Sequence, residues 1–160
     1  STIKKKMVHI DYVVNTAGLL IKKPIDRLSI EELTSLIGVN YTGAVNVAIA
    51  AKPYVLETSG MLMNFTSSSY TRGRAFYAVY SSTNAAIVNF TQALAEEWSN
   101  EGIRVTCINP ERTATPMRTA NFGIEPAGLL LSAQEVALAS LKVLGTQNTG
   151  IIVDVRKDGR

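Results

Sequence analysis

The sequence has a single cysteine, little excess charge and no long apolar run, and each shortage excludes a class of protein. Cys107 has no partner for an internal disulfide and no clustered ligands beside it, so we expect a reducing, cytoplasmic setting and no bound metal. The net charge is only +3, and the basic residues are spread along the chain apart from a triplet at 4–6. Binding to nucleic acid is therefore not expected.

No segment approaches the eighteen or more consecutive apolar residues of a membrane span, and the first residues lack the apolar core and cleavage site of a signal peptide. We therefore expect no membrane partner and no secretion. The sequence also has no internal repeat or low-complexity linker. With 46% apolar residues, its 160 residues suffice for one core, so we expect one unit, residues 1–160.

Strand-like and helix-like segments alternate along the chain, which predicts an α/β fold with a mostly parallel sheet. Strands are expected at 10–14, 61–66, 103–108 and 151–155. Two capping boxes, Ser29 with Glu32 and Ser132 with Glu135, each predict the start of a helix. Further helices are expected from Gly43 to Leu56 and from Tyr77 to Trp98.

The stretch from Glu111 to Leu131 is predicted to be irregular, because two prolines and two glycines interrupt it. Long irregular segments of compact α/β domains are more often ligand covers than connectors. We therefore expect this stretch to lie over a binding site.

Polar residues follow three of the predicted strands, at the sheet edge where open parallel sheets bind ligands. The turn at 15–18 (Asn-Thr-Ala-Gly) follows the first strand, Ser67 follows the second, and the stretch 110–115 follows the third. Tyr80 comes 13 residues after Ser67, on the helix that leaves the same strand.

This ordered set resembles the short-chain dehydrogenase/reductase family, whose members carry an Asn-Asn-Ala-Gly turn, a helix asparagine, an active serine, a Tyr-x-x-x-Lys helix and a Pro-Gly turn leading to threonine. A single element, such as a helix tyrosine, is more often an ordinary core or turn residue, so the order and spacing carry the resemblance. The positions that match are Asn15, Ala17, Gly18, Asn40, Ser67, Tyr80, Pro110 and Thr115.

The resemblance implies a partial Rossmann-type, doubly wound parallel sheet, a cofactor that is NADP or NAD, and a small carbonyl or alcohol substrate. Tyr80 would donate a proton to the carbonyl oxygen while Ser67 holds that oxygen. Asn40 would position a water molecule. The turn at 15–18 (Asn15, Ala17, Gly18) and Pro110 with Thr115 would contact the cofactor.

Asn84 stands where the family carries its catalytic lysine. An asparagine can hydrogen-bond a ribose hydroxyl but brings no positive charge to lower the pKa of the phenol. Alcohol oxidation needs the ionised phenol and suffers most, whereas carbonyl reduction uses the neutral form. The sequence therefore predicts a reductase, if the chain is active.

Two further departures concern the cofactor site. Glu111 replaces the glycine of the Pro-Gly turn, and it either brings a carboxylate near the nicotinamide or turns outward to pair with Arg112. No glycine-rich phosphate-binding turn precedes the first strand. We expect that the first strands of the usual sheet are missing, so that the strand at 10–14 exposes an apolar edge. A missing amino-terminal part is the preferred explanation, and a second chain or domain that completes the sheet is the alternative.

The stretch from Asn109 to Arg118, with 121–126, resembles a subgroup of these reductase domains that occur joined to a nucleotidyltransferase. Proteins of that subgroup reduce ribulose 5-phosphate and then make CDP-ribitol. Arg112 and Arg118 would suit a sugar phosphate, because guanidinium groups bind phosphate with two hydrogen bonds. Both arginines are equally well explained as surface residues.

Two functions are therefore open. The first is an NADPH-dependent reductase of a ketose phosphate, and the second is a catalytically impaired module that serves dimerisation or braces an attached nucleotidyltransferase. In either case the resemblance implies a homodimer or tetramer built on the helices 43–56 and 77–98. Small residues on the second helix would let the helices of two subunits approach closely, namely Ala85, Ala86 and Ala93. These residues are equally compatible with packing on the chain's own sheet.

Overall fold

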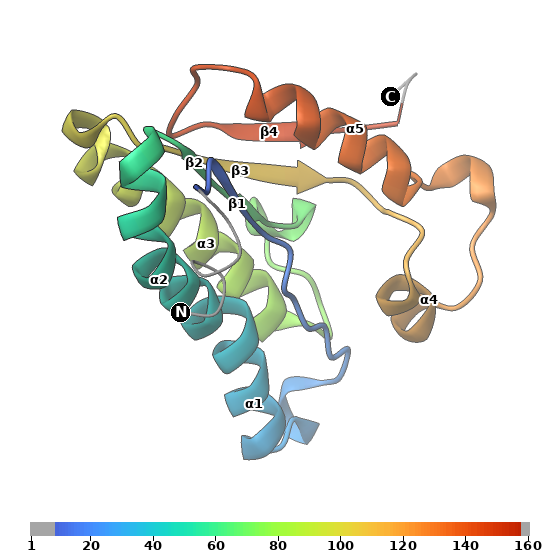
Figure 1. Ribbon diagram of the computed structural model, residues 1–160. Coiled ribbons are helices and arrows are strands. Elements are labelled where there is room, and N and C mark those ends of the chain that lie inside the picture. Colours follow the sequence, from blue (N-terminus) through green and yellow to red (C-terminus); the bar gives the residue numbers. More distant parts are fainter. Residues whose placement is uncertain (1–8, 158–160) are drawn as a thin grey trace.

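Four parallel strands form the centre of the protein, in the order β1-β2-β3-β4 (Figure 1). The computed structural model describes residues 9–157. The strands are β1 (Tyr12–Asn15), β2 (Met61–Phe65), β3 (Arg104–Pro110) and β4 (Ile152–Val155), and each pairs with the next in parallel. The predicted α/β class and parallel sheet are confirmed. The first strand lies slightly later than predicted and includes Asn15.

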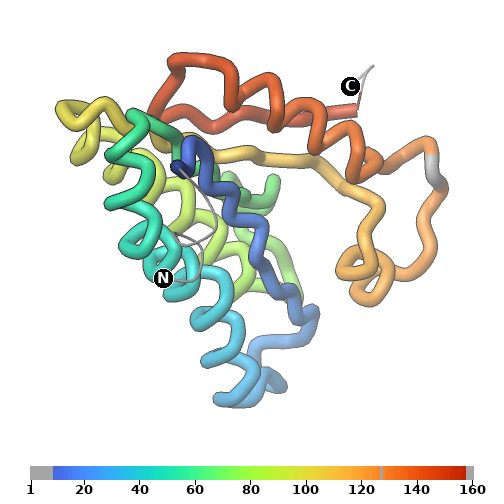
Figure 2. The backbone as a smooth tube through the Cα atoms, in the orientation of Figure 1, coloured from blue at the N-terminus to red at the C-terminus, as the bar shows by residue number. Residues whose placement is uncertain are grey.

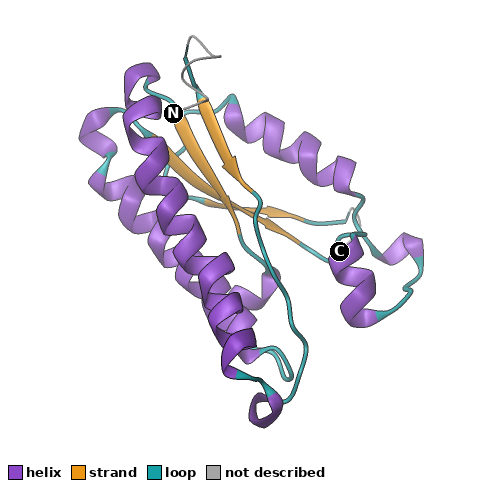
Figure 3. Ribbon diagram, turned by 60° about the horizontal axis from the view of Figure 1, so that its bottom comes forward, coloured by secondary structure: helices purple, strands orange, loops and turns teal. Residues whose placement is uncertain are grey.

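Helices cover both faces of the sheet (Figures 1 and 3). On one face α2 (Gly43–Thr58) and α3 (Ala78–Glu97) pack through Val55 and Leu94 against Leu62 of β2. On the other face α5 (Ala133–Leu144) packs through Val136 against Met63 of the same strand. Because β2 is buried on both faces, its sequence shows no apolar-polar alternation.

The helix that opens at Ser29 does not end before the next one begins. The segment α1 (Ile30–Ile37) joins α2 through a π-helical turn, Gly38–Thr42, and the capping box at Ser29 and Glu32 is formed as predicted. The sequence predicted two separate helices here. A π turn keeps the chain helical while it inserts an extra residue, so periodicity alone reads it as a break, and Asn40 lies within it.

The continuous helix Ile30–Thr58 is 29 residues long and contains an 18-residue window of mean hydropathy 1.3, so by length and composition it could cross a membrane. Core helices pass the same test. Here the helix packs its Ala48 and Val55 against the sheet, and no run of eighteen consecutive apolar residues occurs within it. Only 22% of that window is buried, so packing within the fold accounts for part of the apolar character of this helix.

The stretch predicted to be irregular contains a short helix, α4 (Pro116–Phe122). Thr115 caps it, because its side chain accepts a hydrogen bond from the backbone N–H of Arg118, and Pro116 occupies the first helical position. A threonine followed by proline is a helix-start signal that the density of turn residues in this segment obscured. The prediction of an irregular segment was wrong for these residues. Figure 2 shows that α4 lies away from the helices that cover the sheet.

Strand β1 lies at the edge of the sheet and pairs only with β2 among the described residues. Its side chains alternate in exposure, and Tyr12 and Val14 are 46% and 44% exposed. The predicted apolar edge is therefore present in the structure. An edge of this kind offers unpaired backbone groups and apolar side chains to another segment.

The central position of β2 predicts a large loss of stability when its core is truncated. Leu62 is fully buried between two helices and the neighbouring strands. Replacing Leu62 with Ala should lower the free energy of unfolding by about 2–5 kcal/mol, because the cavity cannot be filled by movement of the sheet. Urea unfolding measures the change. Leu138→Ala on the exposed side of α5 is the control and should change it by less than about 0.5 kcal/mol, and equal losses in both variants would contradict this account.

Candidate active site

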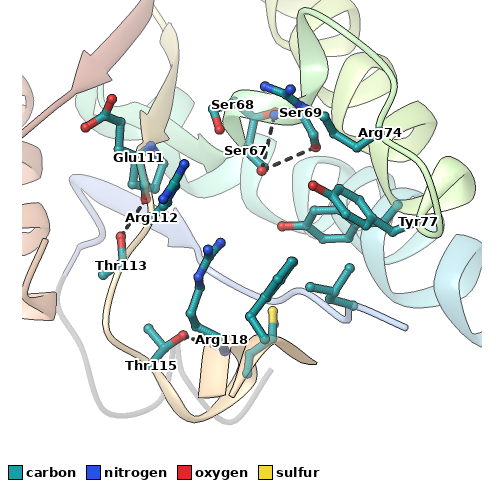
Figure 4. A pocket seen from close by; sticks show the side chains of 16 residues that line it. Ser67, Ser68, Ser69, Arg74, Tyr77, Glu111, Arg112, Thr113, Thr115 and Arg118 are labelled. Atoms are coloured by element: carbon teal, nitrogen blue, oxygen red, sulfur yellow. Dashed lines mark hydrogen bonds between the residues drawn. The ribbon is translucent and has the colours of Figure 1, made fainter. Parts of the chain in front are cut away.

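A cavity of about 390 Å³ lies at the carboxyl ends of β2 and β3 (Figure 4). Its walls come from the segment after β2, the start of α3, the segment after β3, and α4. The predicted site residues that line it are Ser67, Tyr80, Pro110, Arg112, Thr115 and Arg118. The remaining predicted residues lie outside it, namely Asn15, Ala17, Gly18, Asn40 and Asn84.

Ser67 and Tyr80 bring their hydroxyls together in this cavity. Ser67 has an extended backbone and directly precedes the short 3-10 helix Ser68–Tyr70. Its Oγ accepts hydrogen bonds from the backbone N–H of Ser69 at 3.4 Å and from the Ser69 hydroxyl at 3.3 Å. Burial raises the pKa of the Tyr80 phenol above its usual value, and the nearby side chains of Ser67 and Asn84 oppose this shift only in part. At neutral pH the phenol is therefore protonated.

Asn84 is buried and does not line the cavity. Its Nδ2 donates to the backbone carbonyl of Tyr80 at 2.8 Å, and its Oδ1 accepts from the hydroxyl of Thr66 at 3.3 Å. The amide thus braces the first turn of α3 against the end of β2. Its interaction with Tyr80 lowers the pKa of the phenol, but it supplies no positive charge.

Asn40 holds the segment after β1 in place. Its Oδ1 accepts from the backbone N–H of Leu19 at 2.7 Å, and its Nδ2 donates to the carbonyl of Leu19 at 2.9 Å and to the hydroxyl of Thr83 at 3.2 Å. The side chain thereby links this segment to α3. Its predicted part in positioning a water molecule remains a prediction.

The turn after β1 is stabilised locally, with the Oδ1 of Asn15 accepting from the backbone N–H of Ala17 at 3.3 Å. Ala17 and Gly18 are exposed beside the cavity rather than in it. A Cβ atom at Gly18 would lie 3.9 Å from the Cε of Met117, an ordinary contact, so packing does not require glycine there. The predicted cofactor contacts of this turn stay a prediction.

Two charged side chains on the β3 side, Glu111 and Arg118, have different partners (Figure 4). The carboxylate of Glu111 accepts from the backbone N–H of Lys157 at 3.2 Å, so the predicted alternative of an ion pair with Arg112 was wrong. Arg118 makes two hydrogen bonds to Glu125, at 2.6 and 2.9 Å, and its guanidinium lies 4.1 Å from the ring centre of Phe122. The Arg118 cation holds the pKa of the Glu125 carboxyl below its usual value.

The sequence analysis missed the residues that the start of α3 and α4 contribute. Arg74 and Tyr77 line the cavity, and Tyr77 packs edge-on against both Tyr80 and Phe122, at 6.2 and 5.9 Å between ring centres. Neither residue directly follows a strand or stands at a position of the family pattern. Arg74 lies within the segment between β2 and α3, whose polar and charged residues are the signal that could have identified it.

Ser67 and Tyr80 line one cavity at the carboxyl edge of a parallel sheet, which is the arrangement that the family resemblance implies. Comparison with known proteins agrees. The model of the short chain dehydrogenase family matches residues 1–123. The chain belongs to the short chain dehydrogenase family.

Two curated relatives extend this result. The chain is 57% identical over 146 residues to the bifunctional ribulose 5-phosphate reductase/CDP-ribitol pyrophosphorylase of Haemophilus influenzae, covering 91% of this chain and 31% of that protein. It is 37% identical over 138 residues to an uncharacterized oxidoreductase of Staphylococcus epidermidis, covering 85% and 59%. The first relative confirms the narrower resemblance drawn from 109–126. The chain spans less than two thirds of either protein.

Solved structures show the same fold. A 3-ketoacyl-(acyl-carrier-protein) reductase from Brucella melitensis, complexed with NADH, superposes with a TM-score of 0.88 at 26% identity, covering 97% of this chain and 69% of that one. A short chain dehydrogenase from Escherichia coli CFT073, complexed with NADPH, gives 0.88 at 28% identity, covering 96% and 65%. The fold of this chain is therefore that of the nicotinamide-binding reductases.

The position of Asn84 predicts how a positive charge would act on the phenol. Asn84→Lys should lower the pKa of Tyr80, because a cation one helical turn away favours the phenolate. Titration of tyrosinate absorbance, with Tyr80→Phe subtracted, measures the change. Asn84→Gln is the neutral control and should leave the titration of Tyr80 close to that of the unaltered protein. A lysine variant that titrates like the glutamine variant would show that charge at position 84 does not reach the phenol.

Proposed function

We propose that this chain carries the catalytic centre of a nicotinamide-dependent reductase that reduces the keto group of ribulose 5-phosphate or a closely similar ketose phosphate. The observation that carries the proposal is the meeting of the Ser67 and Tyr80 hydroxyls in a cavity whose walls also hold three arginines. Family membership and the name of the Haemophilus influenzae relative support the same assignment.

The hydroxyl groups suit reduction of a carbonyl. As hydride reaches the carbonyl carbon, negative charge grows on the oxygen, and the Ser67 hydroxyl stabilises that charge by donating a hydrogen bond. The Tyr80 phenol donates its proton to the same oxygen, which yields the alcohol. Burial keeps the phenol protonated, so this chain holds the form that reduction uses. Oxidation of the alcohol needs the phenolate, which the raised pKa disfavours.

The cavity fits the reactive end of the cofactor. NADH or NADPH would supply the hydride, and both occur in structures of related proteins. Pro110 and Thr115 line the cavity on the side where the family's Pro-Gly turn meets the nicotinamide, and about 390 Å³ falls in the size range of small-molecule sites. The residues present therefore fit the nicotinamide end, with Asn15, Ala17 and Gly18 proposed for the adenosine side.

We propose further that residues 1–160 make up one partial dinucleotide-binding domain, acting in the cytoplasm. About a third of each aligned structure lies outside the part that this sequence matches. The exposed apolar edge of β1 is the place at which additional strands would continue the sheet. Residues that distinguish NADPH from NADH would lie in those strands.

Tyr80→Phe tests the proposal in the full-length protein that contains this chain. NADPH oxidation in the presence of ribulose 5-phosphate is followed at 340 nm. The kcat of this variant should fall by roughly 100-fold or more, because the proton donor is removed. Tyr12→Phe removes the hydroxyl of a tyrosine that does not line the cavity, and this control should retain normal turnover. Absence of NADPH binding and turnover in the unaltered protein would favour the alternative, a reductase fold kept as a scaffold for an attached transferase.

We also propose that α2 and α3 pack against their copies in a homodimer. Ala85 and Ala93 are exposed on α3, so they do not serve packing on the chain's own sheet. Next to them a shallow apolar groove runs between α1 and α3, lined by Leu33, Ile37, Tyr41, Ala78, Val79, Ser82, Thr83 and Ala86. Small side chains allow two helices to approach closely.

A bulky charge on this face should separate the subunits. Ala85→Arg is expected to shift the protein from dimer to monomer in sedimentation velocity, because two guanidinium groups would be buried without partners. Ala120→Arg, exposed on α4, is the matched control and should leave the sedimentation coefficient unchanged. A dimer that persists in Ala85→Arg would contradict this interface.

A further inference from the structure

The cavity has an unusual charge for a site that binds a neutral carbonyl compound. Three arginines line it, Arg74, Arg112 and Arg118, and Glu111 is the one acidic residue among the lining residues. The carboxylate of Glu111 accepts a hydrogen bond from the backbone of Lys157 rather than pairing with an arginine of the cavity. The walls therefore carry an excess of positive charge, which favours an anionic ligand.

The charge of Arg118 is already compensated. Glu125 accepts two hydrogen bonds from its guanidinium, and the side chains of this pair are 21% and 19% exposed. The guanidinium also lies over the Phe122 ring at 4.1 Å. Since Arg118 is in α4 and Glu125 follows that helix, the ion pair joins two parts of the same segment of the cavity wall. A phosphate would have to displace the carboxylate before it could bind there with two hydrogen bonds.

Arg74 is differently placed. Its side chain is half-buried, and no carboxylate among residues 9–157 lies within ion-pair distance of it. Its backbone N–H donates to the Oγ of Ser81 at 3.3 Å, and Ser81 is itself buried in α3. The segment between β2 and α3 is thus tied to the helix at this residue, which fixes the point from which the guanidinium enters the cavity.

Arg112 lines the same cavity from the segment after β3 (Figure 4), and it too has no carboxylate within ion-pair distance among the described residues. Its cation contributes to lowering the pKa of the Glu125 carboxyl, so its charge is more compensated than that of Arg74. Two guanidinium groups that lack a carboxylate within ion-pair distance are stabilised when an anion binds to both. A phosphate offers the acceptor oxygens that match their donors.

We infer that Arg74 is the principal residue that binds the substrate's phosphate, with Arg112 as the second donor. Arg118 is then a positioning residue that holds α4 through Glu125, in place of the phosphate contact that the sequence suggested for it. The inference rests on the proposed function, since a ketose phosphate must place its keto group at Ser67 and Tyr80 while its phosphate reaches another part of the same cavity. Arg74 would then make the site selective for phosphorylated over unphosphorylated ketoses.

Arg74→Gln in the full-length protein tests the inference. The KM for ribulose 5-phosphate should rise roughly tenfold to a hundredfold, as expected for the loss of a charged hydrogen-bonding partner, while kcat changes little. The KM for NADPH should stay the same, and so should the rate measured with unphosphorylated ribulose. Arg72→Gln is the matched control, because Arg72 is exposed two residues away and does not line the cavity.

Two outcomes decide against the assignment. An unchanged KM for ribulose 5-phosphate in Arg74→Gln excludes Arg74 as the phosphate site. A rise in the KM for NADPH instead assigns the arginine to a phosphate of the cofactor. Loss of folding would appear in the circular dichroism spectrum, and Arg74→Lys, which keeps the charge, then replaces the glutamine variant and should show a smaller rise in KM.

A binding measurement separates this inference from the proposed function. Calorimetric titration with ribulose 5-phosphate should show binding to the unaltered protein and to Arg72→Gln, and loss of binding in Arg74→Gln. If that pattern appears but no variant turns over the ketose with NADPH, the proposed reductase activity fails while the phosphate site stands. If all three proteins bind equally, the phosphate assignment fails whatever the activity.

Discussion

The parallel pairing of β2 with β3 is the constraint on which the rest of the site depends. Because Phe65 pairs with Ile108, both strands end at the same edge of the sheet, and the chain leaves them side by side. Ser67 therefore emerges next to the segment that begins at Pro110. The helix α3 then returns from that edge, and its first turn places Tyr80 over Ser67. A shift of one residue in this register would carry the serine to the opposite face of the sheet.

Burial and hydrogen bonding then decide what the hydroxyls can do. In this family a lysine one turn after the tyrosine supplies a positive charge, and here a neutral amide occupies that position. The side chain of Asn84 hydrogen-bonds to the backbone of Tyr80 and to Thr66, so it stabilises the start of helix α3. The phenol consequently keeps its proton, which is the form that carbonyl reduction uses, and burial also makes it a weaker acid.

Much of the fold could be predicted from the sequence, because its signals are local. The capping boxes at Ser29 and Ser132 each form as predicted, and the strands follow from short apolar runs bounded by turns. The π turn around Asn40 was not predictable, since an inserted helical residue looks like a break in periodicity. The helix α4 escaped because its capping threonine and first proline lie within a segment rich in turn residues.

The site was predictable in its centre and less so in its walls. Ser67 and Tyr80 were found because one follows a strand and both stand in a family pattern. The pairing of Arg118 with Glu125 was not predicted, because no spacing rule indicates that Glu125 folds back upon it. Arg74 was missed for a similar reason, as its place in the cavity depends on how the segment after β2 is tied to Ser81. Such contacts depend on tertiary structure.

The most direct test of the central claim is a crystal structure of the full-length protein with NADPH and a ketose phosphate, or an unreactive analogue. The quantity to measure is the distance from the substrate's carbonyl oxygen to the Tyr80 Oη and to the Ser67 Oγ. The account predicts that both distances fall within about 2.6–3.2 Å, the range of a proton transfer or a hydrogen bond. A carbonyl oxygen that lies beyond hydrogen-bond reach of either hydroxyl would contradict it.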